Sequence, residues 1–504
     1  YNADGVHGEL EWERYPKPGD PNPIVKMGIA HINTSKVVWI DEDENADQYT
    51  AWPFWAPDSK QLFYQVLNRG QDDLQILSAD PETGKNRLVY QEKNNTWVEF
   101  FEDIYILKNN KGFILRSELD GWRHLYYYDM NGKLKKQLTK GEWNVSDIKL
   151  VDEENERVFF EANKGDRLNT QLFVVDFDGD DIEQLTNIPG THKGTVSPTG
   201  KYFYDSYSNI NTPEKLDLYN DSGELIKNLG DRKSKIFDEY NLGTTEIFSI
   251  KTEDGFELPA MWVLPPDFDE NKKYPVLFAV YGGPGGTDVT NSFSAYLDRY
   301  FISQSGIIYF VVDHRGSAYF GKKGTDNLYR NMGKWEINDY IEAAKWLKTK
   351  SFIDSTKIGI TGGSYGGYMV NFALGNTRRF KAGVTQRSVV DLQTFAGSSD
   401  IGFYDNLEFG GYYWENPEGY KRMSPLTYAA NVRDPLLIIH NENDLRCSIE
   451  QAEQLFAALK IRGRTVEFLR FPEESHGLSR GGRPDRRVIR MEAVRDWFDR
   501  YLKK

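Results

Sequence analysis

A serine lies at the centre of the glycine-rich segment 362–366, which reads Gly-Gly-Ser-Tyr-Gly. The segment follows the apolar run 357–361, typical of a buried strand, and precedes a stretch with helical spacing. At such a strand-to-helix turn a serine adopts a strained backbone and exposes its hydroxyl, while the flanking glycines let strand and helix pass closely. Ser364 is therefore a candidate nucleophile.

Two downstream residues could activate this hydroxyl. Asp444 follows the apolar run 436–440, and His476 follows the run 465–471, so each lies after a predicted strand. An imidazole can accept the serine proton, and a carboxylate fixes the imidazole tautomer and stabilises its positive charge. We predict a catalytic triad of these three residues. Glu442 is an alternative acid, while His314 and His440 fit structural roles at the ends of other strands.

The elements that position these residues indicate a parallel α/β sheet over residues 244–504. A β-hairpin at 247–264 precedes buried strands that alternate with helical stretches, which is the pattern of an α/β fold. The predicted strands are 276–280, 307–312, 357–361, 382–385, 436–440 and 465–471, and the predicted helices include 337–350, 367–374, 449–461 and 487–502. We therefore predict an α/β-hydrolase domain.

The first half of the chain repeats. Gly84, Gly132, Gly179 and Gly223 lie at the tips of polar turns, at spacings of 48, 47 and 44 residues. Each turn joins two strand-like runs, and another hairpin precedes it, which gives the four strands of a β-propeller blade. We predict that residues 1–243 form part of an all-β propeller with about four and a half blades. Because an open ring leaves strand edges unpaired, we expect the N-terminal blades to come from polypeptide outside this sequence.

Composition excludes several classes of protein. The formal net charge of −14 argues against a nucleic-acid partner, which needs a clustered basic surface. No window approaches the roughly 18 apolar residues of a membrane span. The single cysteine, Cys447, excludes an internal disulfide and a cysteine zinc site. We expect no cofactor and no metal. The compartment stays open, since a bacterial periplasm and a cytoplasm are both compatible.

These features resemble the prolyl oligopeptidase family of serine peptidases, which joins a propeller to an α/β-hydrolase domain that cleaves short peptides. Segments 15–17 (Tyr-Pro-Lys), 22–23 and 120–126 look like propeller segments of its dipeptidyl peptidase IV branch. Segments 280–284, 313–317 and 363–368 are similar to the hydrolase domain of that branch. In contrast, segments 385–388, 443–447 and 475–480 look more like bacterial acylaminoacyl peptidases.

The resemblance also implies roles for individual residues. The hydroxyl of Tyr281 and the backbone N–H of Tyr365 correspond to oxyanion donors, which a tetrahedral intermediate requires. Arg446 matches a position that binds a substrate backbone carbonyl. The glutamate pair that binds a free substrate N-terminus in the branch would lie upstream of segment 15–17.

The same resemblance implies a pocket for P1, the residue before the scissile bond. Val389, Leu392 and Phe395 fall at its substrate-binding positions. Leu392 and Ser399 stand where the dipeptidyl peptidases carry aromatic residues that enclose a proline ring. We therefore expect a wider, more aliphatic pocket.

The leading hypothesis is a serine peptidase that releases dipeptides from peptide N-termini. An acylaminoacyl peptidase or oligopeptidase with a broad hydrophobic P1 preference is the alternative. An esterase is a third option, but a propeller cap suits peptides better than lipids. A catalytically inactive binding protein would require a lost nucleophile. Peptides are the expected partners, and a homodimer is left open.

Overall fold

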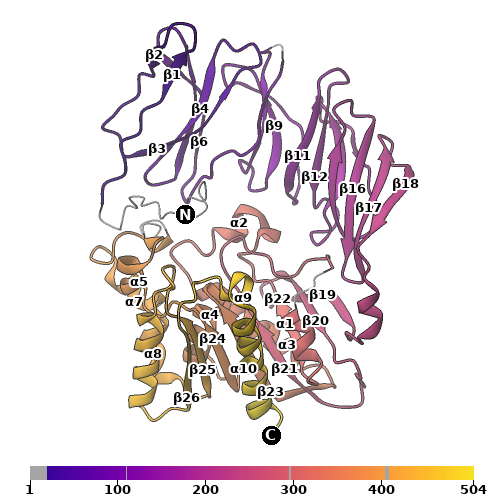
Figure 1. Ribbon diagram of the computed structural model, residues 1–504, viewed down its shortest axis with the longest axis vertical. Coiled ribbons are helices and arrows are strands. Elements are labelled where there is room, and N and C mark those ends of the chain that lie inside the picture. The colour runs from indigo at the N-terminus through magenta and orange to yellow at the C-terminus, as the bar shows by residue number, and fades with distance from the viewer. Residues whose placement is uncertain (1–19, 109, 294–296, 403–407) are drawn as a thin grey trace, which may run out of the picture.

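The structure is a computed structural model that describes residues 20–108, 110–293, 297–402 and 408–504. The Tyr-Pro-Lys segment at 15–17 lies outside the described residues. Two groups of elements pack against each other, antiparallel sheets from the first half of the chain and a mixed sheet with helices from the second (Figure 1).

The first half forms one two-stranded sheet and four four-stranded antiparallel sheets in chain order. The strands are β1 (Gly28–His31) and β2 (Lys36–Trp39); β3 (Gln48–Trp55), β4 (Leu62–Asn68), β5 (Asp73–Ala79) and β6 (Asn86–Lys93); β7 (Ile104–Ile106), β8 (Phe113–Ser117), β9 (His124–Tyr128) and β10 (Leu134–Gln137); β11 (Val145–Asp152), β12 (Arg157–Ala162), β13 (Gln171–Asp176) and β14 (Ile182–Gln184); and β15 (Thr191–Val196), β16 (Tyr202–Asn209), β17 (Thr212–Asn220) and β18 (Leu225–Asp231). Figure 1 shows the sheets side by side. The predicted all-β propeller architecture is confirmed.

The repeating glycines occupy the turn between the third and fourth strands of each sheet. Their φ angles are +74° at Gly84, +77° at Gly132, +70° at Gly179 and +77° at Gly223, a region that disfavours residues with a Cβ atom. A Cβ on each would also lie 1.8–3.0 Å from a backbone carbonyl oxygen of the preceding sheet. The period in the sequence therefore marks the points where neighbouring sheets touch.

The second half forms an eight-stranded sheet in the order β19-β20-β22-β21-β23-β24-β25-β26, parallel from β22 onwards. Its strands are β19 (Thr245–Lys251), β20 (Glu257–Val263), β21 (Tyr274–Ala279), β22 (Ile308–Val312), β23 (Ile353–Gly363), β24 (Ala382–Gln386), β25 (Leu436–Asn441) and β26 (Val466–Phe471). This order is that of the α/β-hydrolase fold, and the predicted fold class is confirmed.

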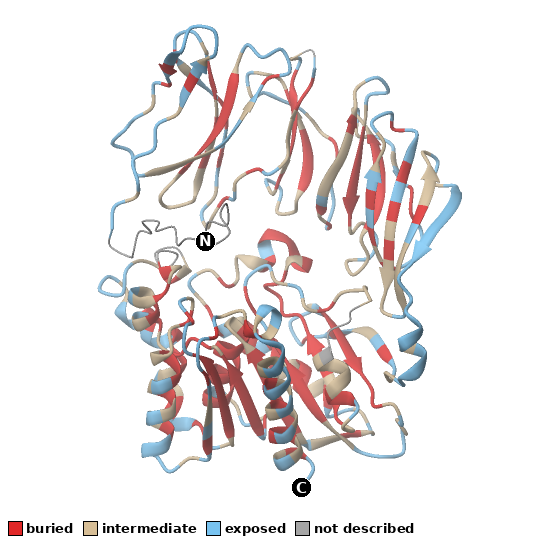
Figure 2. Cartoon of the chain, viewed as in Figure 1, coloured by how far each residue is buried: buried red, intermediate tan, exposed pale blue. Residues whose placement is uncertain are grey.

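Helices cover both faces of this sheet. The α-helices are α1 (Leu297–Ser303), α2 (Gly321–Thr325), α3 (Lys334–Leu347), α4 (Tyr365–Asn376), α5 (Leu392–Ser398), α7 (Pro417–Met423), α8 (Glu450–Ile461), α9 (Leu478–Gly481) and α10 (Pro484–Leu502), and the 3₁₀ turns are η1 (Lys235–Glu239), η2 (Ala318–Phe320) and η4 (Pro425–Asn431). Side chains alternate along β21, where Val276 and Phe278 enter the core beneath α3, α4 and α8 while Leu277 enters the core beneath α1 and α10. Figure 2 shows the central strands buried and β18 exposed along its length.

Two element boundaries differ from the expectation and bear on the site. β23 runs from Ile353 to Gly363, so the strand leads directly into Ser364. α3 begins at Lys334, three residues before the predicted start, because Gly333 has a φ of +83° and its N–H is capped by the Glu336 carboxylate. Among the described residues, no helix combines the length and apolar character needed to span a membrane.

Candidate active site

Ser364 occupies a sharp turn between β23 and α4, with φ 61° and ψ −122°. This backbone conformation is unfavourable for a residue with a Cβ atom, as a nucleophile elbow requires. A Cβ on Gly362 would lie 2.5 Å from the carbonyl oxygens of Gly366 and Val280, and one on Gly366 would lie 2.2 Å from the same Val280 oxygen. The glycines therefore allow the strand, the helix and the end of the adjacent strand β21 to converge beneath the serine.

The three residues of the predicted triad lie within hydrogen-bonding distance of one another. His476 Nε2 is 2.9 Å from Ser364 Oγ, and His476 Nδ1 is 2.7 Å from Asp444 Oδ2. An ionised carboxylate only accepts hydrogen bonds, so Nδ1 donates and Nε2 accepts from the serine hydroxyl. The other oxygen of Asp444 accepts from the backbone N–H groups of Arg446 and Cys447, at 3.0 and 2.9 Å. These bonds hold the imidazole in the orientation that proton transfer from Ser364 needs.

The alternative residues point elsewhere. Glu442 forms an ion pair with Arg470, at 3.1 Å. His440 donates to the carbonyl of Cys447, at 2.7 Å, and His314 is fully enclosed, where burial lowers its pKa to about 3. None of the three forms a hydrogen bond with Ser364, whose hydroxyl bonds to His476, and His476 in turn bonds to Asp444.

The two candidate oxyanion donors flank the elbow. The backbone N–H of Tyr365 lies in the first turn of α4, where amide groups have no intrahelical partner. The ring of Tyr281 lies 6.2 Å from the ring of Tyr365, and 42% of Tyr281 is exposed. Desolvation, assisted by the charge of Asp288, raises the pKa of Tyr281, so its hydroxyl stays protonated and able to donate. Both groups are therefore available as hydrogen-bond donors near the elbow.

A buried carboxylate supports Tyr365. The Tyr365 hydroxyl donates to Glu336 Oε1 at 2.7 Å, and the same oxygen accepts from the Gly333 N–H at 2.9 Å. Glu336 is completely buried, and desolvation raises its pKa to about 7. Sequence reasoning missed Glu336, because only the three-dimensional packing of α3 against α4 brings it to Tyr365.

The predicted P1 residues are buried. Val389, Leu392 and Phe395 are 8%, 1% and 9% exposed and belong to the core beneath α3 and α4. Leu392 in particular is a core residue at the start of α5, so it can affect a P1 pocket only by packing against the residues that form its surface. Ser399 is also enclosed and donates to the carbonyl of Arg446, at 2.7 Å.

Arg446 is held by a carboxylate. Its guanidinium forms an ion pair with Asp400, at 2.5 Å, and 42% of its side chain is exposed. The residue lies two positions after Asp444, so it projects from the loop that carries the acid of the triad. The Asp400 carboxylate therefore orients the guanidinium of Arg446.

A large cavity separates the propeller sheets from the α/β-hydrolase domain. Its volume is about 1130 Å³, and its walls include Trp52 and Phe100 from the propeller and Tyr319 and Glu408 from the hydrolase side. It extends to Gly285, in the loop that carries Tyr281. Ser364 does not line this cavity, which we call the interdomain cavity. A peptide in it would lie next to the candidate oxyanion site.

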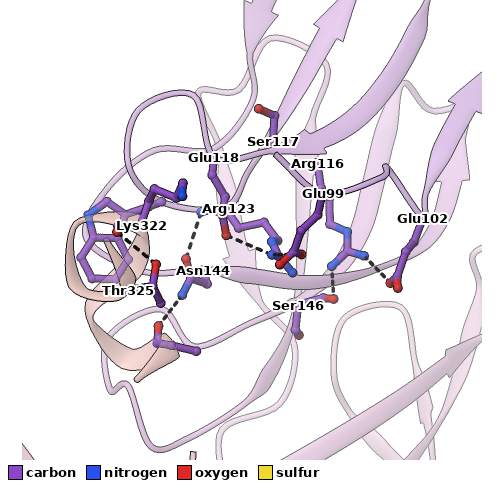
Figure 3. A network of polar contacts seen from close by, with 12 residues as sticks. Glu99, Glu102, Arg116, Ser117, Glu118, Arg123, Asn144, Ser146, Lys322 and Thr325 are labelled. Atoms are coloured by element: carbon purple, nitrogen blue, oxygen red, sulfur yellow. Dashed lines mark hydrogen bonds and ion pairs between the residues drawn. The ribbon is translucent and has the colours of Figure 1, made fainter. Parts of the chain in front are cut away.

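A polar network crosses the wall of the interdomain cavity (Figure 3). Arg123 forms ion pairs with Glu118 and Glu99, at 3.0 and 3.3 Å, and its backbone N–H donates to the Asn144 side chain. Asn144 in turn donates to the carbonyl of Ala318, at 2.9 Å, and so ties the propeller to the hydrolase domain. Residues 174 positions apart meet here, which no local sequence pattern indicates.

Comparison with known proteins agrees with this geometry. Residues 291–504 match the family profile described as the prolyl oligopeptidase family, and residues 1–214 match that of the dipeptidyl peptidase IV N-terminal region. The second half of the chain is thus similar to the prolyl oligopeptidase family, and the first half is similar to the N-terminal region of dipeptidyl peptidase IV.

Individual relatives are similar over much of the chain. An uncharacterized peptidase, YuxL, of Bacillus subtilis is 35% identical over 61% of this chain, and dipeptidyl peptidase 4 of Trichophyton rubrum is 28% identical over 92%. These matches span 47% and 62% of the respective relatives, so the chain corresponds to roughly half to three-fifths of their length. A crystal structure of a putative dipeptidyl aminopeptidase IV from Bacteroides ovatus superposes with a TM-score of 0.86 at 28% identity, covering 99% of this chain and 73% of that one.

Proposed function

We propose that the protein is a serine peptidase that releases dipeptides from the N-termini of peptides. The observation that carries the proposal is the hydrogen-bonded series Asp444–His476–Ser364 at a strained strand-to-helix turn. Similarity of residues 291–504 to the prolyl oligopeptidase family supports peptides as substrates, and the similarity to relatives named dipeptidyl peptidase 4 supports dipeptides as products.

The geometry supports acyl transfer in two halves. Ser364 Oγ attacks the scissile carbonyl carbon while its proton passes to His476 Nε2, and Asp444 stabilises the imidazolium. The carbonyl oxygen becomes an oxyanion that accepts from Tyr281 and from the Tyr365 N–H. The C–N bond then breaks as His476 protonates the leaving amine, which leaves an ester on Ser364. Water, deprotonated by His476, hydrolyses this ester and restores the serine.

Acylaminoacyl peptidase or oligopeptidase activity is the second candidate. Leu392 and Ser399 supply no aromatic walls for a proline ring, and this observation favours a broad hydrophobic P1 preference. The similarity to peptidase YuxL is compatible with either activity. An inactive binding protein has little support, since all three candidate triad residues are present and in contact.

Chromogenic dipeptide anilides test the proposal. A panel with Pro, Ala and Phe at P1 would be assayed with a free and with an acetylated N-terminus. Turnover of the substrates with a free N-terminus alone would support a dipeptidyl peptidase. A preference for the acetylated substrates would support the second candidate. Absence of turnover on both series would contradict peptidase activity of this chain.

We also propose that residues 1–243 form the propeller part and residues 244–504 the peptidase domain. η1 and the segment before β19 supply the connection. Further blades from polypeptide outside this sequence would complete the ring. A crystal structure of the full gene product that shows these sheets closing a ring alone would contradict this proposal.

A further inference from the structure

Arg387 follows β24 directly and extends its side chain across the glycine that precedes the nucleophile. A Cβ on Gly363 would lie 2.9 Å from Arg387 Cζ, so the guanidinium fills space that only glycine leaves open. The φ of Arg387 is +40°, a left-handed conformation that is unfavourable for a residue with a Cβ atom. The chain thus accepts backbone strain to hold a cation beside Ser364, as is common at functional sites.

This guanidinium lacks a counterion. Its side chain forms no hydrogen bond or ion pair with another described residue, and its Nε atom is buried without an acceptor. Burial, and then the positive charges of Arg480 and Arg490, lower the pKa of Arg387 to about 10. Asp444 is the opposite charge nearby, but its oxygens already accept from His476 and two backbone N–H groups. Arg387 as a whole is partly buried, but its Nε atom is enclosed without an acceptor, and a desolvated cationic group without a partner is costly. This position therefore favours an anionic ligand.

A small cavity adjoins the guanidinium. Its volume is about 190 Å³, and its polar lining includes Arg387, Ser479 and Arg490. Arg490 is 4% exposed and binds Asp298 and Gln386, yet its Nε atom also lacks an acceptor among the described residues. Two arginine side chains with unsatisfied Nε atoms therefore meet at one cavity next to the nucleophile.

The cavity and the predicted P1 residues lie on opposite faces of the central sheet. Its apolar wall belongs to the core beneath α1 and α10, whereas the predicted P1 residues belong to the core on the opposite face of the sheet. Ser364 stands at the sheet edge between these faces.

We propose that Arg387 binds a carboxylate of the substrate immediately after the scissile bond, with exposed Arg480 adding positive charge. This inference rests on the proposed peptidase function. In a tripeptide the C-terminal carboxylate stands two bonds from the scissile nitrogen, and an Asp or Glu side chain at P1′, the first residue after that bond, offers the same group. A guanidinium pairs with a carboxylate through two parallel hydrogen bonds. The chain therefore favours substrates in which P1′ is the C-terminal residue, or in which P1′ is Asp or Glu.

A pair of tripeptides tests this. Cleavage of Ala-Ala-Ala with a free carboxylate is compared with cleavage of Ala-Ala-Ala amide, with release of Ala-Ala measured by mass spectrometry. We expect kcat/KM to favour the acid by about 10- to 100-fold, the range of a hydrogen bond to a charged group. The ratio should fall close to unity in Arg387→Met and stay intermediate in Arg387→Lys. Equal rates in the native protein, or an unchanged ratio in Arg387→Met, would overturn the proposal.

Two further experiments ask whether the carboxylate is the C-terminal group or a side chain, and whether loss of any arginine has the same effect. Tetrapeptide amides with Glu or Gln at P1′ ask whether a side-chain carboxylate suffices. A preference for Glu that Arg387→Met abolishes would support a side-chain source, whereas no preference would restrict the site to a C-terminal carboxylate. Arg462→Met is the matched control, because exposed Arg462 follows α8 at the opposite edge of the sheet and should keep the native ratio.

Binding and fold are measured separately from turnover. Calorimetry on Ser364→Ala protein compares the tripeptide acid with its amide, and we expect tighter binding of the acid. Equal affinities there would contradict the carboxylate site even if every peptidase assay failed. Conversely, the protein could hydrolyse dipeptide anilides, which carry no carboxylate, and cleave the tripeptide acid and the tripeptide amide at equal rates. That result would support the proposed peptidase function and contradict the carboxylate site. Arg480→Gln, at an exposed position, covers the case in which Arg387→Met does not fold; it should lower the acid-to-amide ratio.

Discussion

The Tyr365 hydroxyl donates a hydrogen bond of 2.7 Å to Glu336 Oε1, and Glu336 has no exposed surface. The residue that follows the nucleophile is thereby tied to a carboxylate on the neighbouring helix α3. Because the Tyr365 backbone N–H is a candidate oxyanion donor, this side-chain bond helps to fix the donor in place.

Glu336 should make stability fall as pH rises. Burial raises its pKa from 4.5 to about 7, so the folded chain retains a proton between these values that the unfolded chain has released. Its contribution is fully present below pH 4.5 and is lost as pH rises through about 7, a change on the order of 3 kcal/mol. Urea unfolding at pH 4.5 and 8 measures it. Glu336→Gln should flatten this part of the profile, whereas exposed Glu492→Gln should not; an unchanged profile in Glu336→Gln would contradict the assignment.

Ser364→Ala should abolish turnover while the fold remains intact. Loss of the nucleophile leaves only binding and oxyanion stabilisation, a reduction on the order of a million-fold in kcat. Steady-state assays on a dipeptide anilide and circular dichroism check both parts. Ser355→Ala, at the other end of β23, is the control. A variant at Ser364 that kept more than about a hundredth of native kcat would show that another group performs the attack.

Tyr281→Phe should lower kcat by roughly 10²- to 10³-fold with little change in KM, because the hydroxyl acts on the transition state. Tyr240→Phe, at an exposed tyrosine outside the site, should behave as native protein. The two constants are separated by measuring rates over a range of substrate concentrations. An unchanged kcat would return Tyr281 to a purely structural role at the end of β21.

The P1 pocket should accept Ala or Phe as well as Pro. Leu392 and Ser399 replace aromatic walls, and an apolar pocket discriminates by only about 1–3 kcal/mol per methylene-sized difference. Values of kcat/KM for Ala-Pro and Ala-Phe anilides should therefore lie close together. A proline preference above roughly a hundredfold would show that other residues shape the pocket.

The sequence was most informative where local pattern determines structure. The Gly-Gly-Ser-Tyr-Gly segment predicts a strained turn because its glycines are needed wherever strand and helix converge, and Ser364 has that conformation. The glycine period predicts four-stranded sheets because each glycine combines a positive φ with a close contact. Asp444 and His476 could be selected because the carboxyl ends of parallel strands meet at one sheet edge.

Contacts between distant elements escaped sequence reasoning. Glu336 reaches Tyr365 only once α3 packs beside α4, and Asn144 reaches Ala318 only once the two domains dock. Arg387 lies in segment 385–388, which resembles acylaminoacyl peptidases. That its Nε atom lacks a hydrogen-bond acceptor follows only from the three-dimensional structure. Leu392 was expected at the pocket surface, but its depth in the core depends on how α5 packs.

The contact between Gly363 and Arg387 also constrains how this sequence can change over evolutionary time. Any side chain at position 363 would occupy the volume of the guanidinium, and removal of the arginine would leave a void beside the nucleophile. The contact therefore couples the two positions sterically, although they lie 24 positions apart in the sequence. A bulky residue before the serine would require a small residue at position 387, and this exchange would remove the positive charge from the space beside the nucleophile.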